Sequence, residues 1–292
     1  MLGPTASGKS EVALRFAEEI GAEIISVDSM QVYRRMNIGT AKPDLEERAR
    51  VRHHGIDLVE PSDSFSVADF QAVGRAVLTE SEAPVVIAGG SGLHFRALVD
   101  PMRFRPHDAD VRAQIEEFSH QESVERLLAL DAEAGRNLDL ANPRRVTRAL
   151  EIAVLTGETP TARASGPEQE RLSRYEPLFD FKAVALDPDR GLAVRVDQRL
   201  SEMLESGLLA EVAELAPELG RTARQAVGYK ELLPVVAGEV TTEEGTEAAR
   251  RATLALAKRQ RTYFRRDPRL VWLPWSDRAD ERYRSAAEAL RS

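Results

Sequence analysis

Short apolar runs recur along the chain, separated by segments with helical spacing of apolar residues. The runs 23–28 and 84–90 are short and rich in β-branched residues, and further strands are expected at 181–187 and 270–275. Runs of this length are typical of strands that are buried on both faces of a parallel sheet. Helical patterns occupy the segments around the first two runs: 9–20, 43–53 and 66–80. Alternating strands and helices predict an α/β fold, with a parallel sheet flanked by helices.

The stretch 108–180 breaks this alternation, because it is polar, rich in arginine and helical in pattern, without a convincing strand. We therefore predict a helical insertion domain at 108–180, with the α/β core formed by 1–107 and 181–292. The Pro/Gly/Ser-rich segment 159–170 predicts a mobile loop within the insertion. After residue 189 the pattern is mainly helical to about 266, which predicts a helical C-terminal part.

Composition narrows the class of protein further. The chain has 292 residues, 42% of them apolar and 30% charged, which is ordinary for a globular protein of about two domains. The absence of cysteine excludes a disulfide framework, a thiolate metal site and a cysteine nucleophile. No apolar run approaches the ~20 residues of a membrane span, and the N-terminus lacks the layout of a secretory signal. We expect a cytoplasmic protein without a membrane partner.

The charge is acidic overall but locally basic. The net charge is −8, so any contact with nucleic acid must come from local basic patches. The segment 250–269 carries eight basic residues against one acid, and Arg144, Arg145 and Arg148 form a second cluster. Each group could equally be a solvated face, and charge alone leaves the two readings open.

A phosphate-binding pattern opens the chain. Eight residues fit G-x-x-x-x-G-K-[ST], and we call them the P-loop: Gly3, Pro4, Thr5, Ala6, Ser7, Gly8, Lys9 and Ser10. In such a loop, successive backbone N–H groups and the following helix N-terminus surround a phosphate. Lys9 is expected to neutralise terminal phosphate oxygens and Ser10 to hold Mg²⁺, which is the expected cofactor.

A strand of about five residues should precede this motif, yet only Met1 and Leu2 do so. Either the first strand is stunted or the numbered start is late. We favour the late start, and we expect the missing strand to lower the stability of the fold.

A single carboxylate stands out near the P-loop. The strand at 84–88 ends in glycines without an acid, whereas the strand at 23–27 ends in Asp28. Asp28 can serve as a base or as an indirect metal partner, since ligands gather at the carboxyl ends of parallel strands. An Asx turn that merely closes the strand is the alternative, and the residues alone leave it open.

Several further motifs resemble those of the tRNA dimethylallyltransferases. They run in order over nearly the whole chain: DSMQVY (28–33), NIGTAKP (37–43), HHGID (53–57), SVADF (66–70), GGSGLH (89–94), PRRVTRALE (143–151), VGYKE (227–231) and AKRQ (257–260). The chain departs from the family pattern at four positions: His94 replaces Tyr, Arg144 replaces Gln, and Leu254 and Leu256 replace Arg and an aromatic residue.

The resemblance implies a P-loop NTPase-like fold that uses dimethylallyl diphosphate. The family transfers the dimethylallyl group to N6 of adenosine 37 in tRNAs that read codons starting with U. It leaves N6-isopentenyladenosine and diphosphate. Asp28 would be the base and, with Lys9 and Ser10, form the catalytic set. The residues expected to contact tRNA are Asp28, Ser29, Met30, Gln31, Ser91, Arg112, Arg144, Arg145 and Arg148. The insertion would grip the anticodon stem–loop, and the enzyme is expected to be a monomer.

Other functions remain open at this point. A P-loop small-molecule kinase would use Arg144, Arg145 and Arg148 as lid arginines, although it lacks the acid after the strand at 84–88. An adenylate isopentenyltransferase would act on free nucleotides rather than on a polymer. A non-catalytic RNA-binding module would keep the P-loop only as an anion site, and its function would then not depend on Asp28.

Overall fold

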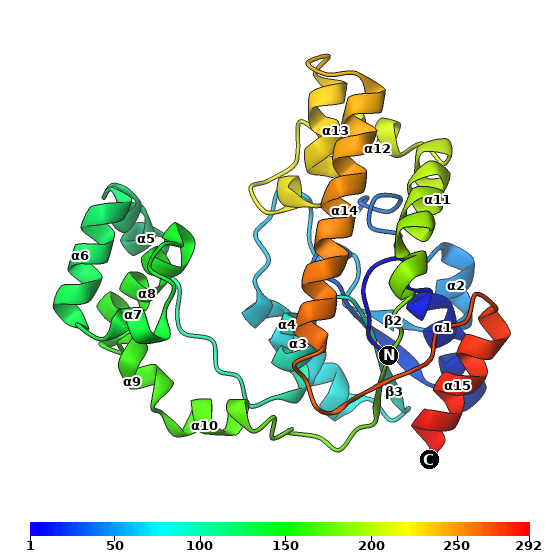
Figure 1. Cartoon of the computed structure of the whole chain (residues 1–292), viewed down its shortest axis with the longest axis horizontal. Coiled ribbons are helices and arrows are strands. Elements are labelled where there is room, and N and C mark those ends of the chain that lie inside the picture. The colour runs from blue at the N-terminus through cyan, green and yellow to red at the C-terminus, as the bar shows by residue number, and fades with distance from the viewer. The chain divides into compact units, whose positions relative to one another are not determined.

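The computed structural model describes all 292 residues, which form two compact units (Figure 1). Unit 1 comprises Met1–Val99 and Phe179–Ser292, and unit 2 comprises Asp100–Leu178. The helical unit thus begins and ends earlier than the predicted range 108–180. Arg105 explains the earlier start, because its guanidinium pairs with Glu158 at 2.6 Å and Glu168 at 2.8 Å, both within unit 2. None of the helices combines the length and the apolar character that a membrane span needs.

The strands of unit 1 form two parallel groups that meet at Leu2. Their bounds are β1 (Glu23–Val27), β2 (His53–His54), β3 (Val85–Gly89), β4 (Ala183–Ala185) and β5 (Leu270–Trp272). One group has the order β2-β1-β3 and the other pairs β4 with β5. Leu2 forms parallel bridges to Gly89 and Ala185, so it occupies the position between β3 and β4. The predicted parallel sheet is confirmed, and the first strand is reduced to this bridge.

Helices cover both faces of the strands. Those of unit 1 are α1 (Lys9–Ile20), α2 (Leu45–Arg50), α3 (Val67–Glu80), α4 (Gly92–Val99), α11 (Leu192–Glu205), α12 (Leu208–Leu215), α13 (Tyr229–Val236), α14 (Thr242–Phe264) and α15 (Ala279–Arg291). Two 3₁₀ turns lie at Asp189–Gly191 and Ala223–Gln225. A hydrophobic core lies on each face of the strands, because successive strand residues point to opposite faces. One core contains Ile24 together with Phe16 of α1 and Tyr283 of α15. The other contains Ile25 together with Phe70 and Leu98.

The helix predicted at 43–53 is shorter than its pattern suggested. α2 begins after Asp44, whose side chain accepts from Glu47 N in a capping box, and it ends at Arg50. The chain then extends into β2, which the sequence analysis did not predict. There His53 pairs in register with Ile24, and His54 Nε2 lies 2.8 Å from Glu23 Oε2. The paired histidines therefore hold the edge of the sheet.

Unit 2 contains only helices: α5 (Ala109–Glu116), α6 (His120–Leu130), α7 (Ala134–Asn137), α8 (Pro143–Thr156), α9 (Pro160–Ala164) and α10 (Pro167–Ser173). Leu127, Val146 and Ala149 form part of its small core. The prediction of a loop at 159–170 is wrong, because α9 and α10 lie there. Each of these helices has proline at its first position, where the missing N–H costs no hydrogen bond, so the composition marks helix starts.

Candidate active site

The P-loop connects Leu2 to α1 and turns tightly to do so. Gly8 has φ 74°, a left-handed conformation that favours glycine, and α1 begins at Lys9. The Lys9 amine donates to the Pro4 carbonyl at 3.1 Å. The hydroxyl of Ser7 is buried and has no hydrogen-bond partner in the chain. An unpaired buried hydroxyl beside a helix N-terminus suits a phosphate oxygen, so the loop retains the geometry of an anion cradle.

Two distant side chains hold the P-loop in place. Arg195 of α11 donates from Nε to the Ala6 carbonyl at 2.7 Å. Gln260 of α14 accepts a hydrogen bond from the backbone N–H of Thr5 at 2.8 Å. The sequence analysis assigned neither residue a role, although Gln260 lies in the AKRQ motif.

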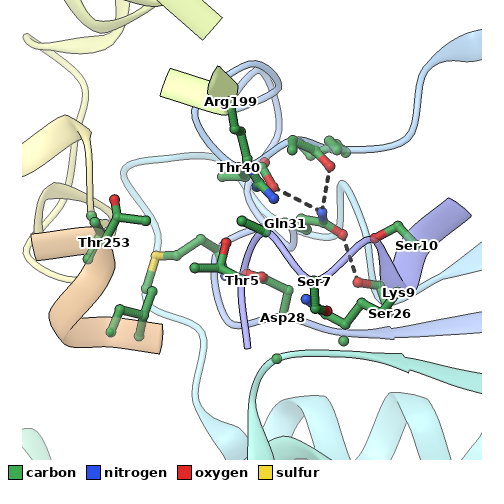
Figure 2. Close-up of a pocket in the computed structure, with 18 of the residues that line it drawn as sticks. Thr5, Ser7, Lys9, Ser10, Ser26, Asp28, Gln31, Thr40, Arg199 and Thr253 are labelled. Carbon is green, nitrogen blue, oxygen red and sulfur yellow. Dashed lines mark hydrogen bonds between the residues drawn. The ribbon is translucent and has the colours of Figure 1, made fainter. Parts of the chain in front are cut away.

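A cavity of about 770 Å³ opens over the P-loop, within the range of small-molecule sites. Figure 2 shows Asp28 lying among Thr5 and Ser7, with Arg199 reaching the cavity from α11 and Thr253 from α14. The predicted phosphate cradle and the predicted base therefore share one cavity. Its other walls include apolar side chains of Met30, Met203, Leu208 and Leu256.

The two carboxylate oxygens of Asp28 have different surroundings. Oδ1 accepts the backbone N–H of Met30 at 2.8 Å, which is the Asx turn considered above. Oδ2 has no hydrogen-bond partner within the chain, and the residue is half-buried at the cavity wall. The two readings are thus compatible, because one oxygen fixes the carboxylate and the other is available to a ligand.

Positive charge surrounds this carboxylate. Burial, together with the charge of Arg199, lowers the pKa of the Lys9 amine to about 8, although Asp28 acts in the opposite direction. Burial likewise lowers the pKa of Arg199, again opposed by Asp28. Arg199 lies on the buried side of an amphipathic helix, where nothing in its local sequence distinguishes it from the other arginines. Only the fold reveals its position.

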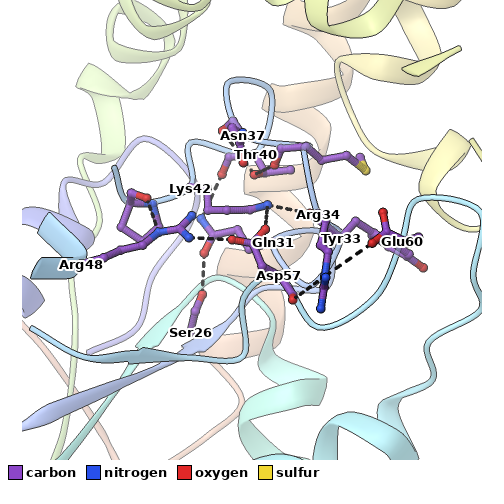
Figure 3. Close-up of polar contacts among 12 residues, drawn as sticks. Ser26, Gln31, Tyr33, Arg34, Asn37, Thr40, Lys42, Arg48, Asp57 and Glu60 are labelled. Atoms are coloured by element: carbon purple, nitrogen blue, oxygen red, sulfur yellow. Dashed lines mark hydrogen bonds and ion pairs between the residues drawn. The ribbon is translucent and has the colours of Figure 1, made fainter. Parts of the chain in front are cut away.

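Gln31, which the resemblance places among the tRNA-contact residues, has a structural role in this fold. Its amide accepts from Ser26 Oγ at 2.7 Å and donates to the carbonyls of Thr40 and Ala41 at 3.1 and 3.0 Å (Figure 3). Both ends of the amide are therefore occupied within the protein. Ser29 and Met30 line the cavity beside it, as the prediction for a substrate-binding segment requires.

The same network holds the loop after Gln31. The side chain of Lys42 is fully buried, pairs with Asp57 at 2.7 Å and donates to the Tyr33 carbonyl at 2.6 Å. Arg48 binds the other oxygen of Asp57 at 2.6 Å (Figure 3). For Asp57, burial raises the pKa, but the hydrogen bonds from Lys42 and Arg48 outweigh it and the net pKa is lowered. These contacts fix one wall of the cavity.

Glu211 of α12 fixes the neighbouring turn. Its carboxylate accepts the backbone N–H groups of Asn37, Ile38 and Gly39 at 2.8–3.0 Å, and the hydroxyl of Tyr229 at 2.5 Å. Burial raises the pKa of the Tyr229 hydroxyl, and the hydrogen bond to Glu211 raises it further. One carboxylate thus satisfies four donors, and no sequence motif identified it.

The predicted tRNA-contact residues fall in both units. Ser91 lines the cavity of unit 1, at the end of β3. In unit 2, Arg148 pairs with the buried carboxylate of Glu151 at 2.8 Å, and Arg112 lies 3.6 Å from it and 2.8 Å from Glu116. These two arginines are therefore engaged within unit 2. The exposed residues of this set are Arg144 and Arg145 at the start of α8.

Few side chains near the P-loop could hold the expected Mg²⁺. No cluster of three or more His, Asp or Glu side chains is suited to hold a metal. Ser10 is exposed at the cavity wall, one residue after Lys9. Mg²⁺ in phosphate sites takes few protein ligands and completes its shell with phosphate oxygens and water, so a single hydroxyl suits it.

Comparison with known proteins agrees with this geometry. A family model described as IPP transferase matches residues 31–267. The tRNA dimethylallyltransferase of Moorella thermoacetica is 41% identical over 290 residues, covering 93% of this chain and 88% of its own. That of Bifidobacterium longum is 38% identical, covering 94% and 85%.

A solved structure is also similar over nearly its whole length. The tRNA isopentenylpyrophosphate transferase of Bacillus halodurans matches with a TM-score of 0.70 at 34% identity, covering 98% of this chain and 93% of that one. Fold, cavity and sequence therefore agree, and the chain belongs to the IPP transferase family.

Proposed function

We propose that this enzyme transfers the dimethylallyl group of dimethylallyl diphosphate to N6 of adenosine 37 in tRNAs that read codons starting with U. The observation that carries the proposal is the free Oδ2 of Asp28 in the same cavity as the unpartnered Ser7 hydroxyl and Lys9. The Asp28 carboxylate can accept a proton from an amine, and the Ser7 hydroxyl and Lys9 can bind a phosphate.

The P-loop binds the diphosphate of the donor. Its N–H groups, the Ser7 hydroxyl and the Lys9 ammonium stabilise the negative charge that grows as the bond from the allylic carbon to oxygen breaks. Ser10 would hold Mg²⁺, which when bound would neutralise part of the diphosphate charge. The apolar residues of the cavity wall, Met30 and Leu208 among them, suit the hydrocarbon part of the donor.

Asp28 acts on the acceptor. The lone pair of the exocyclic amine is delocalised into the adenine ring, so the amine is a weak nucleophile. As N6 bonds to the allylic carbon, the electron pair of the breaking bond leaves with diphosphate, and Asp28 Oδ2 accepts the N6 proton. Arg199 lies close enough for Asp28 to act on its pKa, so a guanidinium lies near the carboxylate that accepts the proton.

The polymeric substrate is supported by basic residues outside the cavity. On α14 the exposed basic residues include Arg251, Lys258 and Arg259, and Arg259 also lines the cavity. In unit 2, Arg144 and Arg145 are exposed at the N-terminal end of α8. Arginine suits RNA because it pairs with phosphates and stacks on unpaired bases. We propose that unit 2 contacts the anticodon stem–loop, and that the enzyme acts as a monomer in the cytoplasm.

The test incubates the enzyme with dimethylallyl diphosphate, Mg²⁺ and an anticodon stem–loop that carries adenosine at position 37. We expect N6-isopentenyladenosine by mass spectrometry. Asp28→Asn should lower its rate at least a hundredfold while RNA binding stays within about twofold. Asp180→Asn, an exposed carboxylate outside the cavity, is the matched control.

Two substitutions of substrate separate the alternatives. Replacing the stem–loop by AMP should abolish turnover, whereas an adenylate isopentenyltransferase would keep it. Replacing the donor by ATP should give no phosphoryl transfer, whereas a small-molecule kinase would show it. If Asp28→Asn prenylates RNA at the wild-type rate, Asp28 is not the general base. If the wild-type protein binds RNA but forms no product, a non-catalytic RNA-binding module is favoured instead.

A further inference from the structure

A serine–histidine pair lies at the edge of the cavity, in the turn between β3 and α4. The hydroxyl oxygen of Ser91 lies 2.7 Å from Nδ1 of His94, one helical turn further along the chain. A serine that directly precedes a helix commonly caps it by accepting a backbone N–H. Here the hydrogen bond of the Ser91 side chain goes to the imidazole instead, so the hydroxyl is oriented by a titratable ring.

Ser91 lies close in the fold to Asp28, the proposed general base. Its backbone N–H donates to the carbonyl of Val27 at 3.0 Å, and Val27 directly precedes Asp28. Both Ser91 and Asp28 line the cavity. The hydroxyl and the free carboxylate oxygen therefore come from neighbouring strand ends and face the same space.

His94 is buried and packs against α3. It is 7% exposed, and its ring packs edge-on against Phe70 of α3, with ring centroids 4.8 Å apart. Burial lowers the pKa of its imidazole, which Asp28 only partly opposes, so the ring is neutral at pH 7. A neutral imidazole carries one N–H, and its other nitrogen is an acceptor.

We propose that His94 is a positioning residue whose Nδ1 accepts the Ser91 hydroxyl proton and so turns the lone pairs of Ser91 Oγ toward the cavity. An exocyclic amine has two N–H groups. Asp28 Oδ2 accepts one of them and Ser91 Oγ accepts the other, which together fix the plane of the amine for attack. This inference rests on the proposed function, and it adds a second acceptor and the residue that aims it.

The decisive comparison is between two polar replacements of His94. In His94→Asn the amide oxygen takes the place of Nδ1, whereas in His94→Gln a polar atom takes the place of Nε2. We expect His94→Asn to keep kcat on the stem–loop within about threefold of wild type. We expect His94→Gln to lower kcat about tenfold, with KM for dimethylallyl diphosphate within about twofold, as for one lost hydrogen bond.

Ser91→Ala supplies an independent test. It should also lower kcat about tenfold, and adding His94→Gln to it should change kcat no further, because the ring acts only through the hydroxyl. Thermal unfolding of each variant checks its fold. Equal kcat values for the Asn and Gln variants would overturn the inference, as would multiplied losses in the double variant. Wild type that forms no product would overturn the proposed function and this inference with it.

Discussion

Gln260 Oε1 lies 2.8 Å from the backbone nitrogen of Thr5, a residue 255 positions away in sequence. The same amide crowds the turn after β3, since a Cβ on Gly90 would come within 2.5 Å of Gln260 Nε2. The Gln260 side chain therefore packs between the P-loop and the end of β3, next to the strand end that carries Asp28. The helix that carries many basic residues thereby also shapes the phosphate cradle.

Removal of this amide should loosen the P-loop. We expect Gln260→Leu to weaken the binding of inorganic diphosphate about fivefold, because a typical hydrogen bond contributes about 1 kcal/mol. Isothermal titration calorimetry measures this affinity. Arg251→Gln, on the same helix but outside the cavity, is the control and should leave the affinity unchanged in high salt. Wild-type affinity in Gln260→Leu would mean that the loop holds its shape without α14.

The turn at 37–39 should be intolerant of change. A Cβ at Gly39 would lie 2.4 Å from the ring of Tyr229, which is fully buried against α12. We expect Gly39→Ala to lower the free energy of unfolding by about 2 kcal/mol through overpacking, measured by urea denaturation. Gly191→Ala is the matched control, because nothing lies within 4 Å of its Cβ position and its φ is −76°.

Glu211 gives the same turn a second test. Glu211→Gln keeps the shape of the side chain but replaces one of two acceptor oxygens by a donor. At least one of the four donors then loses its partner, so unfolding should cost about 1–3 kcal/mol less. A variant as stable as wild type would show that water replaces the carboxylate there.

The sequence predicted those parts of the site whose signal is contiguous. The P-loop and Asp28 each lie in one short motif at a strand end, and the strands are short apolar runs. Arg199, Glu211 and Gln260 act on residues more than 150 positions away, so no local pattern marks them. The segment 159–170 misled for a different reason, because proline and glycine begin helices there as readily as they form loops.

The lowered pKa of Lys9 predicts how anion binding depends on pH. With a pKa of about 8 in the free enzyme, the amine is mostly charged at pH 7 and mostly neutral at pH 9. A bound diphosphate favours the charged form, so binding above pH 8 must take up a proton and becomes weaker as pH rises.

Calorimetry in buffers of different ionisation enthalpy measures that proton directly. We expect inorganic diphosphate to bind several-fold more weakly at pH 9 than at pH 7, after correction for its own ionisation, with proton uptake near pH 8.5. Lys9→Met should bind weakly and lose this uptake, whereas Lys258→Met, an exposed lysine of α14, should keep it. Equal proton uptake in Lys9→Met would assign the titration to another group.

Unit 2 contains a carboxylate whose charge should be essential to its stability. Glu151 is fully buried and accepts from His107 Nδ1 at 2.5 Å, with Arg148 at 2.8 Å. Burial alone would raise the pKa of Glu151, but the hydrogen bonds from Arg148 and His107 outweigh it and the net pKa is lowered. A carboxyl whose pKa is lower in the folded state stabilises that state above its unfolded pKa, near 4.5, and loses this contribution as pH falls through the folded value.

Glu151→Gln should therefore destabilise unit 2 by about 2 kcal/mol at pH 7, and by less near pH 3.5, which lies below the unfolded pKa, so that protonation of the unfolded carboxyl already reduces the contribution of the wild-type charge. Hydrogen exchange of residues 100–178 in the full chain, followed by mass spectrometry, reports this unit separately from unit 1. Glu116→Gln removes a more exposed partner of Arg112 and should cost less than about 0.5 kcal/mol at either pH. A loss in Glu151→Gln that is the same at both pH values would mean that the side chain stabilises unit 2 by its shape and not by its charge.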